Sequence, residues 1–169
     1  MLRDLLIPDW TAQGTLVQLQ LQVLLDKGIR ALVLDVDRTL LPRRQSELPA
    51  PAKAWLLEAR ERLPIHLLSN NPSRRRIGAV ARCVDLPFTS GAAKPRRSAL
   101  RRVLAELDVP PAQVALVGDR LFTDVLAGNR LGLFTVLVKP IAPDGQPSRH
   151  DHLQGIERRM ARWILATFH

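Results

Sequence analysis

The chain has only one cysteine, no tyrosine and only 4% aromatic residues. It therefore has few residues for disulfide bonds or for stacking on nucleic-acid bases. The lone Cys83 cannot form an intrachain disulfide, and its apolar surroundings favour a packed position on a helix. The few Trp and Phe residues are scattered, which argues against a surface that stacks the bases of single-stranded nucleic acid.

Long apolar runs are also missing. No stretch approaches the ~20 residues that a membrane-spanning helix needs. Arg3, Asp4 and Asp9 interrupt the N-terminal segment, where a signal peptide would be apolar. These features predict a cytoplasmic protein.

Acidic residues are outnumbered by basic ones. Lys and Arg number 25 against 16 Asp and Glu, which gives a formal net charge of +9. This excess, almost all of it arginine, predicts a polyanionic partner, either an anionic membrane surface or a nucleic acid. With 46% hydrophobic residues, the chain can still bury one core.

Two carboxylates follow the apolar run Ala31–Leu34. Such a short run, led in by a lysine and a glycine, is typical of a buried parallel strand. Asp35 and Asp37 therefore stand at the carboxyl end of a strand, where open α/β sheets build their ligand sites. Together they can hold a divalent cation, although an Asx-type turn would give the same local pattern.

Three further polar elements follow in order. Ser69 ends a second apolar run and leads into Asn70. Lys94 opens a third segment, and Asp119 ends a fourth run with Asp124 five residues later. Because the carboxyl ends of parallel strands share one edge of a sheet, we expect these side chains to meet.

This ordered set, from about residue 32 to about residue 132, resembles the haloacid dehalogenase (HAD) superfamily of phosphohydrolases. The resemblance is strongest to subfamily IIIA, the YqeG-type branch that includes phosphatidylglycerophosphate phosphatases. It implies an α/β, capless HAD-type Rossmann-like fold, with a mostly parallel central sheet and helices on both faces.

The resemblance also implies roles for individual residues. Asp35 would be the nucleophile and Asp37 the general acid/base. Three residues would bind phosphate: Ser69, Asn70 and Lys94. Magnesium would be held by Asp35, Asp119, the Asp37 backbone carbonyl and, in support, Asp124.

Phosphate ester hydrolysis requires such groups on independent grounds. An aspartate nucleophile divides the reaction into two steps through an aspartyl-phosphate. Its negative charge repels the phosphate, so Mg²⁺ and a lysine are needed to neutralise the encounter. A second carboxylate must then protonate the leaving group. Arg38 departs from the family pattern, which more often has Asn or Gly at this position.

The remaining patterns predict repeated strand and helix units in one domain spanning residues 1–169, with a catalytic core over about 29–139. Helical spacing predicts helices over Pro49–Leu63, from Ser73 to about Cys83, and from Pro95. We expect a strand over Leu133–Val138. The segment Thr15–Leu25 is ambiguous between strand and helix, and we favour helix.

A basic amphipathic helix is predicted over about residues 151–168. Ile156, Met160, Trp163, Ile164 and Phe168 share one face, with three arginines on the other side. This helix can dock on its own domain, which we favour, or on a membrane.

The motif spacing leaves no room for a cap domain. An open site favours a bulky substrate, and arginines are expected around its mouth, namely Arg38, Arg43, Arg44, Arg74, Arg75, Arg76, Arg96, Arg97 and Arg120. With the resemblance, the sequence predicts a magnesium-dependent phosphatase, and the resemblance to the subfamily implies phosphatidylglycerophosphate as its substrate. Alternatives are a phosphatase of a protein or nucleic-acid phosphate, and a catalytically weak RNA- or protein-binding module on the same fold.

Overall fold

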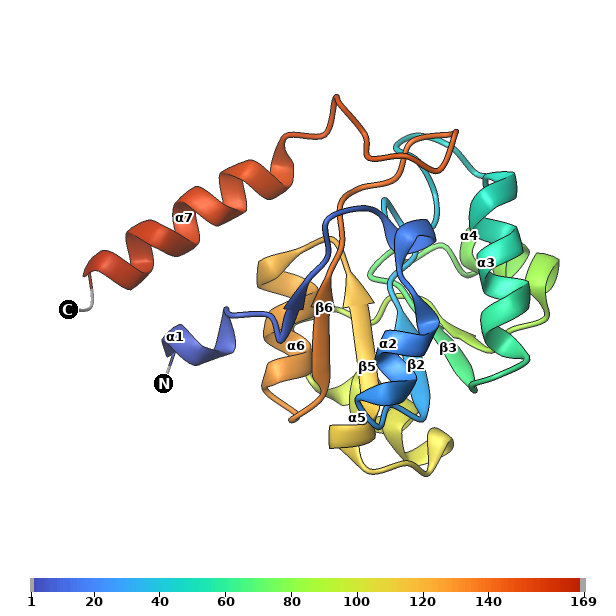
Figure 1. Ribbon diagram of the computed structural model, residues 1–169, viewed down its shortest axis with the longest axis horizontal. Helices are drawn as coiled ribbons and strands as arrows, with labels where there is room; N and C mark the ends of the chain where they lie inside the picture. Colours follow the sequence, from blue (N-terminus) through green and yellow to red (C-terminus); the bar gives the residue numbers. More distant parts are fainter. Residues whose placement is uncertain (1, 168–169) are drawn as a thin grey trace.

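A parallel sheet forms the centre of the computed structural model, which describes residues 2–167 (Figure 1). All of its neighbouring strands pair in parallel, and their order is β1-β6-β5-β2-β3-β4. The strands span Trp10–Thr11 (β1), Ala31–Leu34 (β2), Ile65–Leu68 (β3), Phe88–Thr89 (β4), Val114–Gly118 (β5) and Phe134–Leu137 (β6). The mostly parallel sheet expected from the sequence is therefore confirmed.

The order of the strands reverses at β2. Successive strands β3 and β4 add on one side of β2, whereas β5 and β6 add on the other. In open α/β sheets such a switch point leaves a crevice beyond the carboxyl ends of the central strands. Asp35 follows β2, and its backbone N–H donates to Val117 O of β5 at 3.0 Å. The first motif is thus held at the crevice by the sheet itself.

Helices cover both faces of the sheet because side chains alternate along each strand. Leu32 and Leu34 of β2 belong to a larger apolar cluster that includes residues of α2, α3 and α4. Ala31 and Val33 belong to a second cluster, which includes residues of α5 and α6. The helices span Leu21–Asp26 (α2), Ala50–Arg60 (α3), Arg74–Val84 (α4), Ser98–Leu107 (α5) and Leu126–Asn129 (α6).

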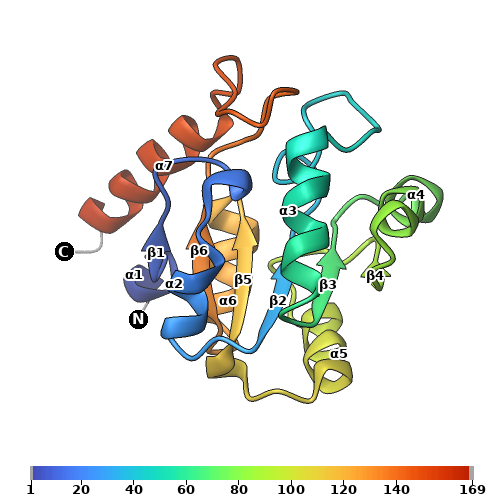
Figure 2. The same ribbon diagram turned by 45° about the vertical axis from the view of Figure 1, so that its right-hand side comes forward.

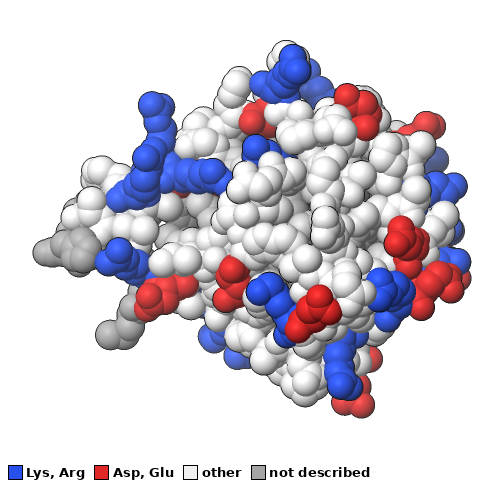
Figure 3. Space-filling view, viewed as in Figure 1, with Lys and Arg blue, Asp and Glu red and all other residues white. Residues whose placement is uncertain are grey.

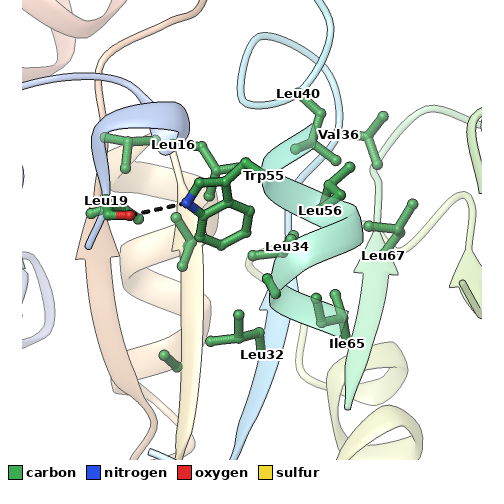
Figure 4. Close-up of a cluster of buried hydrophobic side chains, with 14 of the residues drawn as sticks. Leu16, Leu19, Leu32, Leu34, Val36, Leu40, Trp55, Leu56, Ile65 and Leu67 are labelled. Carbon is green, nitrogen blue, oxygen red and sulfur yellow. Dashed lines mark hydrogen bonds between the residues drawn. The ribbon is translucent and has the colours of Figure 1, made fainter. Parts of the chain in front are cut away.

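Trp55 of α3 lies within the larger cluster (Figure 4). Its ring packs among leucines, while its indole N–H donates to Leu19 O at 3.0 Å. A buried tryptophan needs such an acceptor, because an unpaired N–H in an apolar core costs about 1–3 kcal/mol. The bond ties the segment before α2 to the face of the sheet.

Most of the expected helices are present, with two differences. Ser73 caps α4 as predicted, accepting from Arg76 N at 3.2 Å. The third helix begins at Ser98 rather than at Pro95, because residues 93–96 form a turn first, closed by a hydrogen bond from Arg96 N to Ala93 O at 2.9 Å. The ambiguous segment divides into a 3₁₀ helix, Leu16–Gln18, followed by α2.

Cys83 was expected to be packed in the interior, and this expectation was wrong. It lies on α4 as predicted, but its side chain is exposed. The buried positions of α4 are Ile77, Gly78, Val80, Ala81 and Val84. Cys83 lies beside this stripe and faces solvent, so an apolar neighbourhood in the sequence did not imply burial.

The N-terminal segment adds the edge strand β1 through a small polar network. Asp9 accepts hydrogen bonds from the Thr135 backbone N–H at 2.8 Å and from its hydroxyl at 3.1 Å. The single hydroxyl hydrogen of Thr135 can go instead to Asn129 Oδ1 at 2.9 Å, and Asn129 Nδ2 donates to Leu5 O at 3.0 Å. These contacts hold helix α1, Leu2–Leu5, against α6.

The C-terminal helix α7, Leu153–Thr167, lies beside the sheet and projects away from it (Figures 1 and 2). Its Glu157 and Ala161 are buried, whereas Ile156, Met160 and Trp163 are 52%, 53% and 70% exposed. The helix does dock on its own domain, through a mixed face in which Glu157 makes polar contacts and Ala161 joins an apolar cluster with Leu121 and Leu137. Phe168, which was expected on the apolar face, lies outside the described residues. No helix within residues 2–167 has the length and hydropathy to cross a membrane.

Candidate active site

Three carboxylates from two neighbouring strands converge at the switch point. Asp35 follows β2, Asp119 follows β5, and Asp124 lies in the π-helical turn Leu121–Val125. Each offers a carboxylate oxygen, and these oxygens lie within 4.8 Å of one another. Asp119 and Asp124 are only 1% exposed. Desolvated like charges repel strongly, so such a cluster requires cations around it.

Lys94 supplies one cation at the centre of the cluster. Its buried ammonium group donates to Asp35 Oδ1 at 2.8 Å, to Asp124 Oδ1 at 2.7 Å and to Leu68 O at 2.9 Å. The three ammonium hydrogens are therefore all engaged by protein acceptors. Burial alone would lower the pKa of Lys94, but Asp124 and Asp35 outweigh it and raise the pKa above its ordinary value.

Gly118 makes room for the third carboxylate. A Cβ atom at this position would collide with the carboxyl group and Cβ of Asp124. The backbone N–H of Arg120 also donates to Asp124 Oδ2 at 3.2 Å. Both oxygens of Asp124 are thereby bound by the protein, so its orientation is fixed.

Thr39 connects the other two carboxylates. Its hydroxyl lies 3.1 Å from Asp35 Oδ2 and 3.5 Å from Asp119 Oδ1, and it is fully buried. A hydroxyl has one hydrogen, so it can donate to only one of them at a time. Thr39 lies four residues after Asp35 in the sequence, but nothing in the sequence alone assigned it a function.

The site has more negative than positive charge. Burial raises the pKa of Asp119 well above its ordinary value, and the charges of Asp35 and Asp124 raise it further. Burial and the charge of Asp35 also raise the pKa of Asp124, to about 6, although Lys94 opposes this. Three carboxylates with hard oxygen ligands around one ammonium group fit a divalent cation such as Mg²⁺.

Asp37 lies apart from this cluster at the mouth of the site. Arg76 Nη2 donates to Asp37 Oδ1 at 3.0 Å, and Asn71 Nδ2 donates to Asp37 Oδ2 at 3.3 Å. Its side chain is 39% exposed. The carboxyl group can therefore exchange protons with solvent while Arg76 and Asn71 hold it in place.

The loop after β3 brings hydrogen-bond donors to the same opening. The buried Ser69 accepts from Asn71 N at 3.0 Å, which leaves its hydroxyl hydrogen available for a ligand. The Asn70 side chain is engaged in both directions with the Lys94 backbone, donating to Lys94 O at 3.0 Å and accepting from Lys94 N at 2.7 Å. Asn70 therefore joins the second and third motifs.

These groups line a cavity of about 280 Å³. Its walls include all the sequence-predicted site residues except Asp124, which lies beneath Lys94. Four of the nine arginines expected at the mouth also line it, namely Arg38, Arg43, Arg44 and Arg120. Arg76 does not line the cavity but pairs with Asp37, which does, and the Arg74 guanidinium lies 5.1 Å from the centre of the Phe88 ring.

Arg38 occupies a left-handed backbone conformation, with φ of 67°. Asn and Gly tolerate this region better than other residues, which explains why an arginine here is unusual. Arg38 Nε lies 3.0 Å from Asp151 Oδ2, close enough for an ion pair but without hydrogen-bond alignment. The ion pair directs Arg38 toward the segment before α7.

The start of α7 also holds the loop that carries Asp119. Gln154 Nε2 donates to Asp119 O at 2.8 Å. Glu157 accepts from Arg120 Nε at 2.6 Å and from Leu121 N at 3.0 Å. Sequence reasoning missed these contacts, because they join residues 35 to 37 positions apart and carry no local pattern.

Comparisons with known proteins agree with this arrangement. A family model described as HAD-hydrolase-like matches residues 91–157. The chain is 28% identical to "Probable phosphatase YqeG" of Bacillus subtilis, over 95% of this chain and 92% of that protein. It is 33% identical to "Phosphatidylglycerophosphate phosphatase 1, chloroplastic" of Chlamydomonas reinhardtii, over 84% of this chain but only 56% of that protein.

The fold has counterparts among solved structures. A HAD-like family hydrolase from Porphyromonas gingivalis superposes with a TM-score of 0.54 at 15% identity, covering 78% of this chain and 98% of that one. At this identity the likeness concerns the fold alone. The parallel sheet with helices on both faces is thus a known fold.

Proposed function

Because the chain is a HAD-like phosphatase, we propose that it hydrolyses phosphate monoesters with Mg²⁺ and through an aspartyl-phosphate on Asp35. The observation that carries this proposal is the buried cluster of Asp35, Asp119 and Asp124 around Lys94. The cluster combines a nucleophile, metal ligands and a fixed cation at one point.

The metal would be held by Asp35, Asp119 and the Asp37 backbone carbonyl, with Asp124 in support. When bound, Mg²⁺ neutralises the charge that otherwise separates a carboxylate from a phosphate dianion. Asp35 then attacks phosphorus through one carboxylate oxygen. Thr39 and Lys94 each bind one oxygen of Asp35 and hold the side chain for that attack.

Asp37 is the proposed general acid/base. It gives its proton to the leaving oxygen in the first step and accepts one from water in the second. Its exposed position at the mouth, beside Arg76 and Asn71, suits exchange with both the leaving group and water.

Ser69, Asn70 and Lys94 are the proposed phosphate ligands. Ser69 can donate through its hydroxyl, while Asn70 can contribute its backbone N–H because its side chain is engaged by Lys94. Lys94 can reach a phosphoryl oxygen only if it gives up one present acceptor. Once Asp35 carries the phosphoryl group, Lys94 can exchange its hydrogen bond to Asp35 for one to a phosphoryl oxygen.

For the substrate we propose the lipid phosphatidylglycerophosphate. The named activity of the chloroplast relative supports it, and so does an open cavity rimmed by arginines. A peripheral position at the cytoplasmic membrane surface would bring the enzyme to such a lipid. We further propose that residues 1–169 act as one domain in doing so.

The exposed side of α7 supports that location. Ile156, Met160 and Trp163 are more than half exposed along one stripe, and Lys and Arg side chains gather over the same helix (Figure 3). The exposed arginines of α7 are Arg158, Arg159 and Arg162. Apolar residues beside cations are typical of helices that lie in an anionic membrane interface.

The test is phosphate release by the purified protein from four substrates. These are phosphatidylglycerophosphate in vesicles, glycerol 3-phosphate, a phosphopeptide and a 5′-phosphorylated oligonucleotide, each with Mg²⁺ and with EDTA. We expect Mg²⁺-dependent release, highest from the lipid. The Asp35→Asn variant is the control for contaminating phosphatases. No release from any substrate would overturn the phosphatase proposal, whereas a preference for the peptide or oligonucleotide would overturn only the lipid assignment.

A further inference from the structure

A second hollow adjoins the active-site cavity and shares part of its wall. The second hollow has a volume of about 270 Å³ and is lined by Pro42, Arg43, Arg44, Ile141, Ser148 and His150. Pro42, Arg43 and Arg44 also line the catalytic cavity. A molecule with its phosphate beside Asp35 can therefore extend past these two arginines into the second hollow.

Most other cations of the site are already neutralised. Lys94 binds Asp35 and Asp124. The remaining pairs are Arg38 with Asp151, Arg76 with Asp37, and Arg120 with Glu157. Within the part of the chain that the structure describes, Arg43 and Arg44 form no such ion pair. Their charges remain available for a ligand.

The backbone that carries these arginines is well fixed. Arg38 N donates to Leu41 O at 2.8 Å, and Gln45 N donates to Pro42 O at 3.0 Å. Leu41 and Pro42 are buried. Arg44 has a left-handed φ of 62°, which a non-glycine residue adopts only when its surroundings impose it. The two guanidinium groups thus extend from a constrained turn.

The turn lies close to Asp37, the residue proposed to act on the leaving group. It follows Asp37, the proposed proton donor to the leaving oxygen, by only a few residues, and residues 37 and 41 form an isolated bridge. Ser69 and Lys94 lie on the loops after β3 and β4, where the transferred phosphoryl group is expected. A leaving group protonated by Asp37 would therefore lie close to the turn that carries Arg43 and Arg44.

Resting on the phosphatase function proposed above, we propose that Arg43 and Arg44, with Ser148 and His150, form a binding site for a second anion on the leaving group. A phosphodiester is the class of anion that fits, because guanidinium groups bind its two free oxygens and the hydroxyl and imidazole add further donors. The lipid phosphatidylglycerophosphate carries such a diester one glycerol away from its monoester. The enzyme would then prefer this diester-bearing head group to simple monoesters.

The experiment uses soluble substrates, so that membrane binding plays no part. Glycerophosphoglycerol phosphate, the deacylated lipid, carries both groups, whereas glycerol 3-phosphate shares the monoester and lacks the diester. We expect the wild-type kcat/KM to favour the first substrate by at least about tenfold. The double variant Arg43→Gln, Arg44→Gln should lose this preference, because its KM should rise by about tenfold more for glycerophosphoglycerol phosphate than for glycerol 3-phosphate.

A matched control separates this site from the overall charge. Arg101 and Arg102 are exposed on α5, outside both hollows, and Arg101→Gln, Arg102→Gln removes the same charge. The control should retain the wild-type preference. A wild-type enzyme without preference, or a preference that survives in the Arg43, Arg44 double variant, would overturn the proposed site.

Two further outcomes are distinguishable. If a 5′-phosphorylated dinucleotide shows the arginine-dependent preference and glycerophosphoglycerol phosphate does not, the lipid-type diester is wrong. If the wild type hydrolyses no monoester, the phosphatase function fails. In that case, calorimetric measurement of glycerophosphoglycerol binding tests the proposed diester site without catalysis. Equal affinity in the wild type and the double variant, or no binding to either, would overturn the proposed site.

Discussion

The Lys94 ammonium group donates to Asp124 Oδ1 at 2.7 Å, and both side chains are buried. Asp124 does not line the cavity, so its carboxylate acts on the site through Lys94 and through the neighbouring acids. Lys94 in turn holds Asp35 on its other side. The proposed nucleophile Asp35 is therefore oriented by Lys94, and Lys94 is held in place by Asp124.

Replacing Lys94 by Met should destabilise the metal-free protein by about 3–5 kcal/mol, because three buried carboxylates lose their neutralising partner. Urea unfolding in EDTA measures this loss. Mg²⁺ should restore part of the stability, since it neutralises the same carboxylates. A loss below about 1 kcal/mol would mean that Lys94 does not carry the charge balance of the site.

Asp119→Asn should raise the stability of the metal-free protein and remove its stabilisation by Mg²⁺. The folded-state pKa of Asp119 is raised well above its ordinary value, so ionisation destabilises the fold above about pH 4. The penalty grows as pH rises through the raised pKa and is relieved as pH falls. The difference in melting temperature between variant and wild type in EDTA should therefore shrink from about pH 7.5 to about pH 5.5. An equal Mg²⁺ shift in both proteins would exclude Asp119 as a ligand.

Asp35→Asn should reduce kcat by at least about 10⁴-fold, because the amide cannot attack phosphorus. The fold should persist, since the amide oxygen of the new side chain can still accept a hydrogen bond from Lys94 or Thr39. Circular dichroism and phosphate release check the two statements together. A folded variant with Mg²⁺-dependent turnover would show that another group is the nucleophile.

Asp37→Asn should slow the reaction by about 10²- to 10⁴-fold, which is the usual contribution of acid/base catalysis. Arg76→Gln should cost only about threefold to tenfold, because its ion pair with Asp37 is partly exposed. Steady-state kinetics with a soluble monoester compare the two. Near-wild-type rates in the Asp37 variant would remove this residue from the mechanism.

At Arg38, substitution by Asn should give a more stable protein than substitution by Ala, by about 0.5–1 kcal/mol. Both variants lose the ion pair with Asp151, but Asn adopts the left-handed backbone more readily. Urea unfolding at one pH provides the comparison. Equal stabilities would indicate that the backbone at residue 38 relaxes once the arginine is removed.

The sequence was sufficient to predict which side chains meet at the site, for a local reason. Asp35, Ser69 and Asp119 each follow a short apolar run, and the carboxyl ends of parallel strands necessarily meet at one edge. The parallel sheet and the approximate helix positions came from the same periodic patterns. The roles assigned to these residues stay predictions until the variants are measured.

Contacts between residues far apart in the sequence became visible only in the tertiary structure. The amphipathic pattern of α7 suggests docking through Ile156, Met160 and Trp163, yet Glu157 and Ala161 are the buried residues. A periodic pattern identifies an apolar face but not the surface that receives it. Here the Arg120 side chain and the Leu121 N–H bind the Glu157 carboxylate, and Ala161 packs in an apolar cluster beside them. These partners come together only once β5 and the loop after it have folded.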